Sequence, residues 1–194
     1  MMKQPTKREA TRLKMIEAAS RNFRAHGFAG VGVDAIAKSA GVTSGAFYAH
    51  LDSKGAAFLT ALEVGLNEVI EAIPAFQSEH GDTWIDAFVD YYLGQPHRED
   101  MTCGCAMTAL SPDVMRGDDA ARGLYEEKMS AIAELVAGGL PGDDQADREV
   151  RAWSFLQVLI GGLTMSRSTL SSESSDRIAA AAKRSARAIA IGTS

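Results

Sequence analysis

Apolar residues recur every three or four positions along most of this chain, and this periodicity is the feature that most limits its possible folds. In residues 6–26, basic residues fill the positions between the apolar ones, which are Leu13, Ile16, Ala19 and Phe23. Alternating patterns typical of β-strands are scarce. We therefore predict an all-α protein of about nine helices.

Glycines and prolines divide this pattern into segments. Gly27 is expected to end the first helix, Gly41 the second and Pro74 the fourth. Thr43 is expected to cap the third helix through its hydroxyl group. The other predicted helices cover residues 33–40, 55–73, 82–93, 102–115, 118–137, 144–167 and 174–190.

The composition indicates the cellular compartment of the protein. It has no run of about 18 uncharged apolar residues, so we expect no membrane span. The N-terminus carries basic residues without the apolar stretch of a secretory signal. With two cysteines, Cys103 and Cys105, the chain lacks a disulfide framework, and we expect a cytoplasmic protein.

Charge is distributed unevenly about Lys54. Residues 1–54 hold nine Lys and Arg against four Asp and Glu, a net charge of +5, while residues 55–194 carry −10. A small basic segment before a larger acidic one is a hint of binding to nucleic acid, although charged runs are more often solvated surface. We predict a head at 1–54 and a body at 55–194.

Two short helices with a glycine turn between them form a helix-turn-helix, whose second helix can lie in the DNA major groove. Many such helical hairpins only pack against the rest of the protein. The surface residues of the second helix of the pair therefore indicate whether it can bind DNA. Phe47 is expected to face inward, and small or hydrogen-bonding side chains remain outside. The outward residues are Thr43, Ser44, Gly45, Tyr48 and His50.

The run from Ile36 to Lys54, preceded by the segment 23–28, resembles the DNA-binding head of the TetR family of transcriptional regulators, over about residues 10–62. The resemblance implies that the third helix reads the major groove. It also implies that Tyr48 and Lys54 hold phosphates, and that the partner is double-stranded DNA with a palindromic operator. The sequence departs from the family at three positions, which are Gly32, Leu51 and Gly55.

The body resembles one branch of the same family. This resemblance implies a homodimer formed by the last two helices and an effector pocket among the fourth to eighth helices. The small pair Gly161-Gly162 would permit close helix approach, although packing within one chain is the plain alternative. Candidate dimer residues are Trp153, Leu156, Ile160, Gly161, Leu163, Ile178 and Ala182. Candidate pocket residues, which suit a small hydrophobic effector, are Phe58, Leu62, Leu66, Trp84, Phe88, Tyr92, Cys105, Met107, Leu110, Tyr125 and Phe155.

We predict a transcriptional regulator, by family habit a repressor, which needs neither cofactor nor metal. Two alternatives remain open: a regulator that senses oxidants or electrophiles through Cys103 and Cys105, and a helical interaction protein without DNA binding. Catalysis is not expected, because the chain lacks a glycine-rich phosphate loop and the common hydrolase motifs, and its four histidines are scattered.

Overall fold

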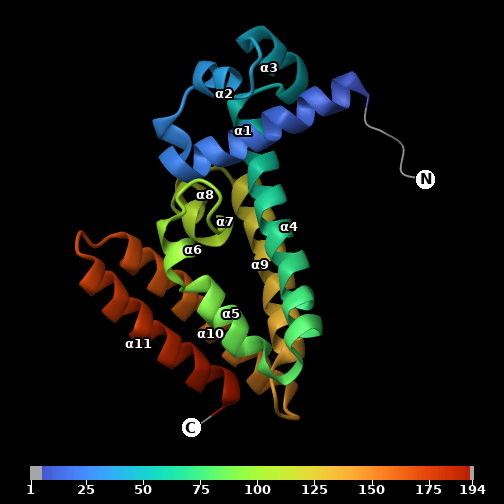
Figure 1. The fold of residues 1–194 in the computed structure, drawn as a ribbon. Helices are drawn as coiled ribbons and strands as arrows, with labels where there is room; N and C mark the ends of the chain where they lie inside the picture. Colours follow the sequence, from blue (N-terminus) through green and yellow to red (C-terminus); the bar gives the residue numbers. More distant parts are fainter. Residues whose placement is uncertain (1–5, 193–194) are drawn as a thin grey trace. The chain divides into compact units, whose positions relative to one another are not determined.

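The computed structural model describes residues 6–192, and this part of the chain forms eleven α-helices and one 3-10 turn, without a β-strand (Figure 1). The predicted all-α class is confirmed. The helices are α1 (Lys7–Gly30), α2 (Val33–Ser39), α3 (Ser44–Leu51), α4 (Lys54–His80), α5 (Trp84–Tyr92), α6 (Gln95–Glu99), α7 (Ala106–Ala109), α8 (Ser111–Arg116), α9 (Asp119–Gly139), α10 (Gln145–Arg167) and α11 (Ser172–Ile191).

Each of the nine predicted helices has a counterpart in the structure. The predicted segment 102–115 is divided into α7 and α8, and the short helix α6 was not predicted. The predicted end of the fourth helix was wrong: α4 continues past Pro74 to His80. Pro74 is exposed while Ile73 beside it is fully buried, so packing of the apolar stripe outweighs the hydrogen bond that proline removes.

The chain packs as two compact units. Among the described residues, the first unit contains residues 6–65 together with Met101–Tyr125, and the second contains Leu66–Asp100 and residues 126–192. Residues 101–125 therefore pack with the N-terminal helices, although they lie far along the sequence. The functional division predicted at residue 54 concerns which residues contact DNA, and it stays a prediction.

The first unit is built on three aromatic rings that come from α1 and α4. Phe23 and Phe28 stack with centroids 5.9 Å apart, and Phe58 meets both rings edge-on. Helix α1 begins with a capping box between Thr6 and Glu9 and is broken at Gly27, where φ is +71°. The predicted stop at Gly27 is thus a kink, after which one more helical turn follows.

Two residues of α1 differ from the amphipathic pattern. Leu13, expected to be buried, is 58% exposed, and the first fully buried residue of α1 is Met15. Arg24, expected on the surface, is 7% exposed, and its guanidinium donates a hydrogen bond to the carbonyl oxygen of Cys103 at 3.2 Å. Helix α1 therefore also packs against the 101–125 segment of its own unit.

The second unit is organised around the antiparallel pair α10 and α11, which lie side by side in Figure 1, with α5 packed against α11. The side chains of Trp84, Phe88, Tyr92 and Phe155 form a connected cluster of buried rings. Buried Arg151 on α10 donates hydrogen bonds to the carbonyl oxygens of Ala190 and Pro141, at 2.7 and 2.6 Å. This arginine ties the end of α11 to the start of α10.

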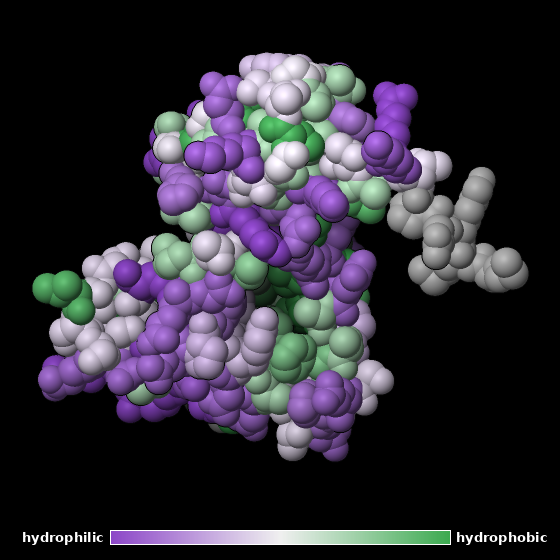
Figure 2. Space-filling model, turned by 45° about the horizontal axis from the view of Figure 1, so that its top comes forward, coloured by the Kyte–Doolittle hydropathy of each residue, from purple (hydrophilic) through white to green (hydrophobic). Residues whose placement is uncertain are grey.

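The surface is mostly hydrophilic on the face seen in Figure 2, where hydrophobic residues lie between hydrophilic ones. Within residues 6–192, no helix is long and apolar enough to cross a bilayer.

Candidate nucleic-acid interface

The helix-turn-helix is formed by α2, a tight turn and α3. Gly41 adopts a φ of +71° in the turn, a conformation that residues with a Cβ rarely adopt. The hydroxyl oxygen of Thr43 accepts a hydrogen bond from the backbone N–H of Ala46 at 3.2 Å, which confirms the predicted cap of α3. Phe47 and Leu51 are buried on the inner side of the helix. The inner contacts thereby fix which face of α3 points outward.

The outward face of α3 carries the residues predicted to contact DNA. Thr43 and Gly45 are exposed, and Ser44 and His50 are half-buried. Tyr48 is 51% exposed, and its ring packs edge-on against Phe47 with centroids 5.6 Å apart. The ring is therefore held in place while much of its surface remains open to a partner.

Lys54 is the first residue of α4, three positions after the end of α3. It is half-buried, and its Nζ stands 4.4 Å from the centroid of the Phe28 ring. This cation–π contact supports the long side chain at the start of a helix, where backbone N–H groups also favour an anion. A cation held there is suited to a phosphate.

Asp34 is a surface residue that the sequence analysis missed. It lies in the first turn of α2, and one of its carboxylate oxygens accepts a hydrogen bond from the hydroxyl of Ser44 at 2.5 Å. Gly32 occupies the cap position before α2 and provides no side-chain cap, as its departure from the family pattern implies. The sequence could not reveal the contact, because it joins two helices across the turn.

The candidate effector residues divide between the two units. Phe58, Leu62, Cys105, Met107, Leu110 and Tyr125 belong to the first, and Leu66, Trp84, Phe88, Tyr92 and Phe155 belong to the second. Phe58 lines a mainly apolar pocket of about 300 Å³ in the first unit, together with Phe28 and Leu59. Trp84 lines another pocket in the second unit, of about 520 Å³. The effector site itself stays a prediction.

The candidate dimer residues occupy two sides of α10 and α11. Leu156, Leu163 and Ala182 are buried within the chain, so they would support a dimer surface from behind. On the open side, Trp153 is 39% exposed, and no atom lies within 4 Å of a Cβ added at Gly161. The half-buried side chains of Ile160 and Ile178 complete the candidate set.

Cys103 is exposed and Cys105 is half-buried, and a sensing role for these thiols stays a prediction. In the described part of the chain, no group of three or more His, Cys, Asp and Glu side chains is placed to hold a metal ion.

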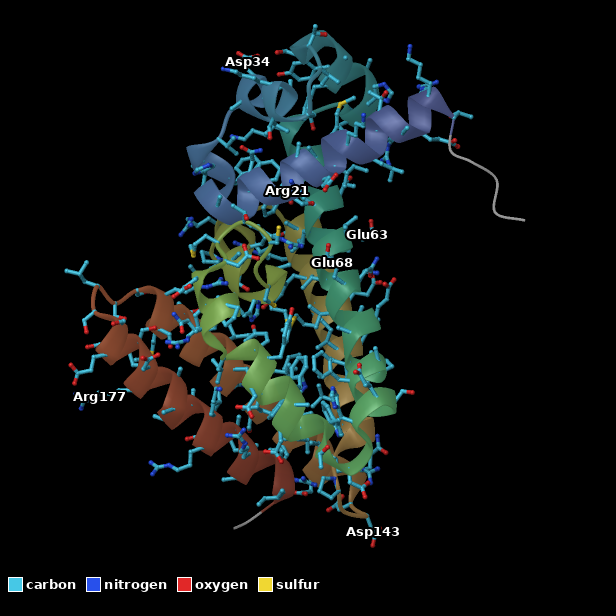
Figure 3. All side chains as sticks on the ribbon, viewed as in Figure 1. Arg21, Asp34, Glu63, Glu68, Asp143 and Arg177 are labelled. Carbon is cyan, nitrogen blue, oxygen red and sulfur yellow. The ribbon has the colours of Figure 1, made fainter. Side chains whose placement is uncertain are left out.

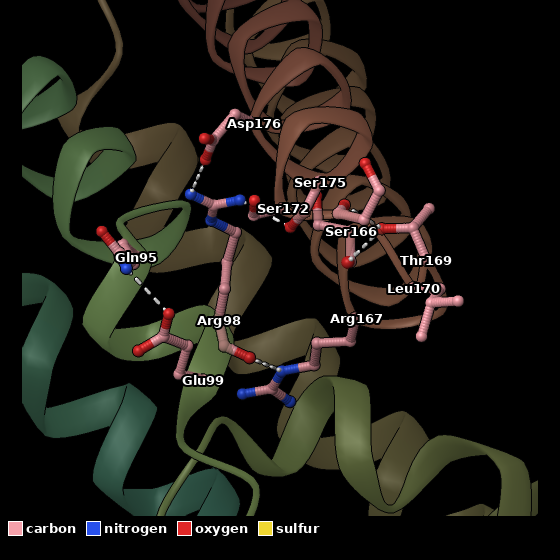
Figure 4. A pocket seen from close by; sticks show the side chains of 11 residues that line it. Gln95, Arg98, Glu99, Ser166, Arg167, Thr169, Leu170, Ser172, Ser175 and Asp176 are labelled. Atoms are coloured by element: carbon pink, nitrogen blue, oxygen red, sulfur yellow. Dashed lines mark hydrogen bonds and ion pairs between the residues drawn. The ribbon is translucent and has the colours of Figure 1, made fainter.

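A pocket of about 250 Å³, lined mainly by polar and charged residues, lies where α6 meets α10 and α11 (Figure 4). Arg98 donates hydrogen bonds to Ser175 at 2.6 Å and to Asp176 at 2.5 Å. Arg167 donates to the backbone carbonyl oxygens of His97, Arg98 and Asp100. These contacts hold the short helix α6 in place, and none of the predicted site residues takes part in them.

Fold and surface together define an all-helical protein with a helix-turn-helix at its N-terminal end. Residues 15–60 match the family model described as bacterial regulatory proteins of the tetR family. The chain is 33% identical over 88 residues to the HTH-type transcriptional repressor SCO4008 of Streptomyces coelicolor, a match that covers 45% of each chain. The alignment thus spans less than half the length of this relative.

Solved structures share the fold over nearly the whole chain. A TetR-family regulator from Cytophaga hutchinsonii superposes with a TM-score of 0.80 at 17% identity, covering 98% of this chain and 100% of that one. The reduced form of Escherichia coli NemR gives a TM-score of 0.72 at 18% identity, with coverage of 90% and 96%. Residues 15–60 thus match the TetR family of bacterial regulatory proteins, and the described chain shares the fold of solved TetR-family structures.

Proposed function

We propose that this protein is a sequence-specific DNA-binding transcriptional regulator, a repressor that a small hydrophobic effector releases from a palindromic operator. The observation that carries the proposal is the outward face of α3. Its side chains are small or hydrogen-bonding, and its inner side is fixed by Phe47 and Leu51. Such a helix fits the major groove without a bulky apolar side chain in the way.

Each residue of this face has a proposed part. Tyr48 and Lys54 position the head on backbone phosphates, because one offers a hydroxyl on a supported ring and the other a supported cation. Thr43 and Ser44 contact base edges, and His50 lines the same surface. Gly45, which is exposed and has no side chain, lets the backbone of α3 approach the DNA closely.

We further propose that residues 1–54 act as the DNA-binding domain and residues 55–194 as the effector-binding and dimerisation domain. The open side of α10, with Trp153 and Gly161, would meet a second copy of the chain, so that two heads read a palindrome. Such a regulator works in the cytoplasm, where the DNA is.

Release from DNA requires that effector binding in the body changes the conformation of the head. A route exists within the first unit: the backbone N–H of Phe28 donates a hydrogen bond to the carboxylate of Asp113 at 2.8 Å. Asp113 lies on α8, and both residues line the apolar pocket that contains Phe58. A shift of α8 would therefore pull on the kink at the end of α1.

The test is selection of fragmented genomic DNA by the purified protein at about 0.15 M salt, a concentration at which non-specific binding is weakened. We expect enrichment of a short palindrome. Tyr48→Ala should weaken binding to all sequences alike, whereas Tyr91→Ala, which removes an exposed tyrosine from α5, should not. Lys54→Ala should reduce the slope of log affinity against log salt by about one unit.

A selection without enrichment over Tyr48→Ala would reject the proposal and favour an interaction protein. If Lys54→Ala changed the sequence preference and left the non-specific affinity intact, Lys54 would not be a phosphate contact. The rest of the proposal would stand. Arg122→Ala, which removes a positive charge from the surface of the same unit, is the control for the loss of charge alone.

A further inference from the structure

Asp34 and Ser44 are joined across the helix-turn-helix. Ser44 is the first residue of α3, and its hydroxyl donates to the Asp34 carboxylate at 2.5 Å. Asp34 is exposed on the outer side of α2, where Figure 3 labels it. The two side chains therefore form one polar spot beside Thr43 and Gly45.

The direction of this hydrogen bond decides what the spot can recognise. A serine hydroxyl has a single proton, and here that proton is given to a carboxylate, a partner that makes a stronger bond than a neutral oxygen. The lone pairs of Ser44 and of the carboxylate remain, and all of them are acceptors. The pair thus offers a partner acceptors and no donor.

Bases differ in what they present to such a surface. In the major groove, cytosine offers the N4 amino group and adenine the N6 amino group, whereas guanine and thymine offer acceptor atoms at the corresponding edge. Phosphates also carry acceptors and negative charge, so a carboxylate repels them. An acceptor surface on the DNA-reading side of the head is therefore matched to an exocyclic amino group.

We propose that Asp34 and Ser44 together form a specificity-determining site that accepts a hydrogen bond from the amino group of one cytosine or adenine in each half of the operator. This inference rests on the proposed function, because it assumes that α3 enters the major groove. The pair selects against guanine and thymine at that position. The negative charge of Asp34 also lowers affinity for DNA in general.

The experiment compares base preferences by sequencing the DNA selected by the wild type and by variants Asp34→Ala and Ser44→Ala. In the wild type we expect cytosine or adenine at one position of each half-site. Both variants should lose about tenfold discrimination or more at that same position and keep it elsewhere. Asp34→Ala should in addition bind random DNA more tightly.

Glu17→Ala is the matched control, because Glu17 is an exposed carboxylate of α1 that pairs with Arg21 in the same unit. It removes an equal charge from the head and should leave every base preference unchanged. Thermal unfolding of each variant identifies any variant that fails to fold.

A second arm uses the wild-type protein alone, so that folding of a variant is not in question. Operators are made with N4-methylcytosine or N6-methyladenine at the selected position, which replaces the amino hydrogen facing the groove. Whichever base is used, its methylation should reduce affinity about tenfold or more, and the same modification one turn away should not.

Wild-type protein that selects no site would reject the proposed function and this inference with it. Wild-type protein that selects a palindrome, with variants and methylated operators that leave the preference unchanged, would reject the inference and keep the function. A uniform loss of affinity in both variants would show that the hydrogen bond merely joins α2 to α3, and would also reject it.

Discussion

Gly162 of α10 lies directly against Ala182 of α11: a Cβ added at Gly162 would stand 2.5 Å from the Cβ of Ala182. The same added atom would come within 3.4 Å of Leu93. The two C-terminal helices therefore approach each other as closely as a glycine allows.

Gly162→Ala should accordingly lower the free energy of unfolding by about 1–3 kcal/mol, because the methyl group forces the helices apart. Gly123→Ala is the control, since Gly123 lies inside α9 with no atom within 4 Å of an added Cβ, and should raise stability by about 0.5–1 kcal/mol. Urea unfolding followed by circular dichroism measures both. Equal effects from the two substitutions would contradict the close contact.

Pro74→Ala should stabilise the protein. Pro74 is an exposed residue inside α4, where proline withholds a backbone N–H from the helix. Alanine restores that donor, and we expect a gain of about 1–3 kcal/mol in the free energy of unfolding. Ala75→Gly is a comparison for helix propensity alone at an exposed neighbour and should cost about 1 kcal/mol. A loss of stability in Pro74→Ala would show that the proline has a packing role.

His97 should make stability depend on pH. Its Nδ1 lies 2.7 Å from the carbonyl oxygen of Tyr92, and its ring stacks on Tyr91 with centroids 5.2 Å apart. Burial lowers the pKa of His97 below its usual value, and the nearby positive charge of Arg167 acts in the same direction. The folded state thus favours the neutral imidazole.

Because the unfolded chain takes up this proton near pH 6.5, the contribution of His97 is complete above that pH and is lost as the pH falls toward its lowered folded-state pKa. The difference in unfolding free energy between wild type and His97→Gln should therefore shrink between pH 7.5 and 5.5. His26→Gln controls for the loss of an exposed imidazole. A difference in unfolding free energy that grows as the pH falls would contradict the lowered pKa of His97.

Trp153→Glu should weaken self-association. Trp153 is 39% exposed on the side of α10 that also carries exposed Val150 and Met165. A carboxylate there would have to lose its hydration in an interface, which is costly without a partner. Sedimentation velocity at several concentrations should show a shift toward monomer. Met115→Glu, at a 67% exposed methionine of the first unit, should sediment like the wild type.

The helical class and most helix positions followed from the sequence, because apolar spacing and glycine turns report on the backbone of each segment separately. Thr43 shows this well, since its role as a cap depends on residues three positions away. The burial of Arg24 could not be predicted in that way. Its partner is a carbonyl oxygen 79 positions along the chain, which no local pattern reveals.

The candidate site shows the same limit. Tyr48 and Lys54 could be predicted as phosphate-contacting residues because they lie within one short motif. Their side chains are supported by Phe47 and Phe28, which are near them in the sequence or in the fold. Asp34 was missed, since an aspartate in the first turn of a helix is also a common partner of the helix dipole. Its link to Ser44 exists only once α2 and α3 are folded against each other.

The composition of the first unit limits how segments of this chain can be exchanged with those of other proteins of the same fold. A gene cut at one place near residue 54 or 65 would transfer α1, α2 and α3 without Asp113, which accepts the Phe28 N–H, and without the carbonyl of Cys103 that Arg24 binds. A chimera that keeps this head intact needs two crossovers, so that the segment 101–125 travels with it. Exchange at a single junction would separate buried Arg24 from the Cys103 carbonyl that it binds. It would also remove the Asp113 carboxylate from the N–H of Phe28, beside the kink at Gly27.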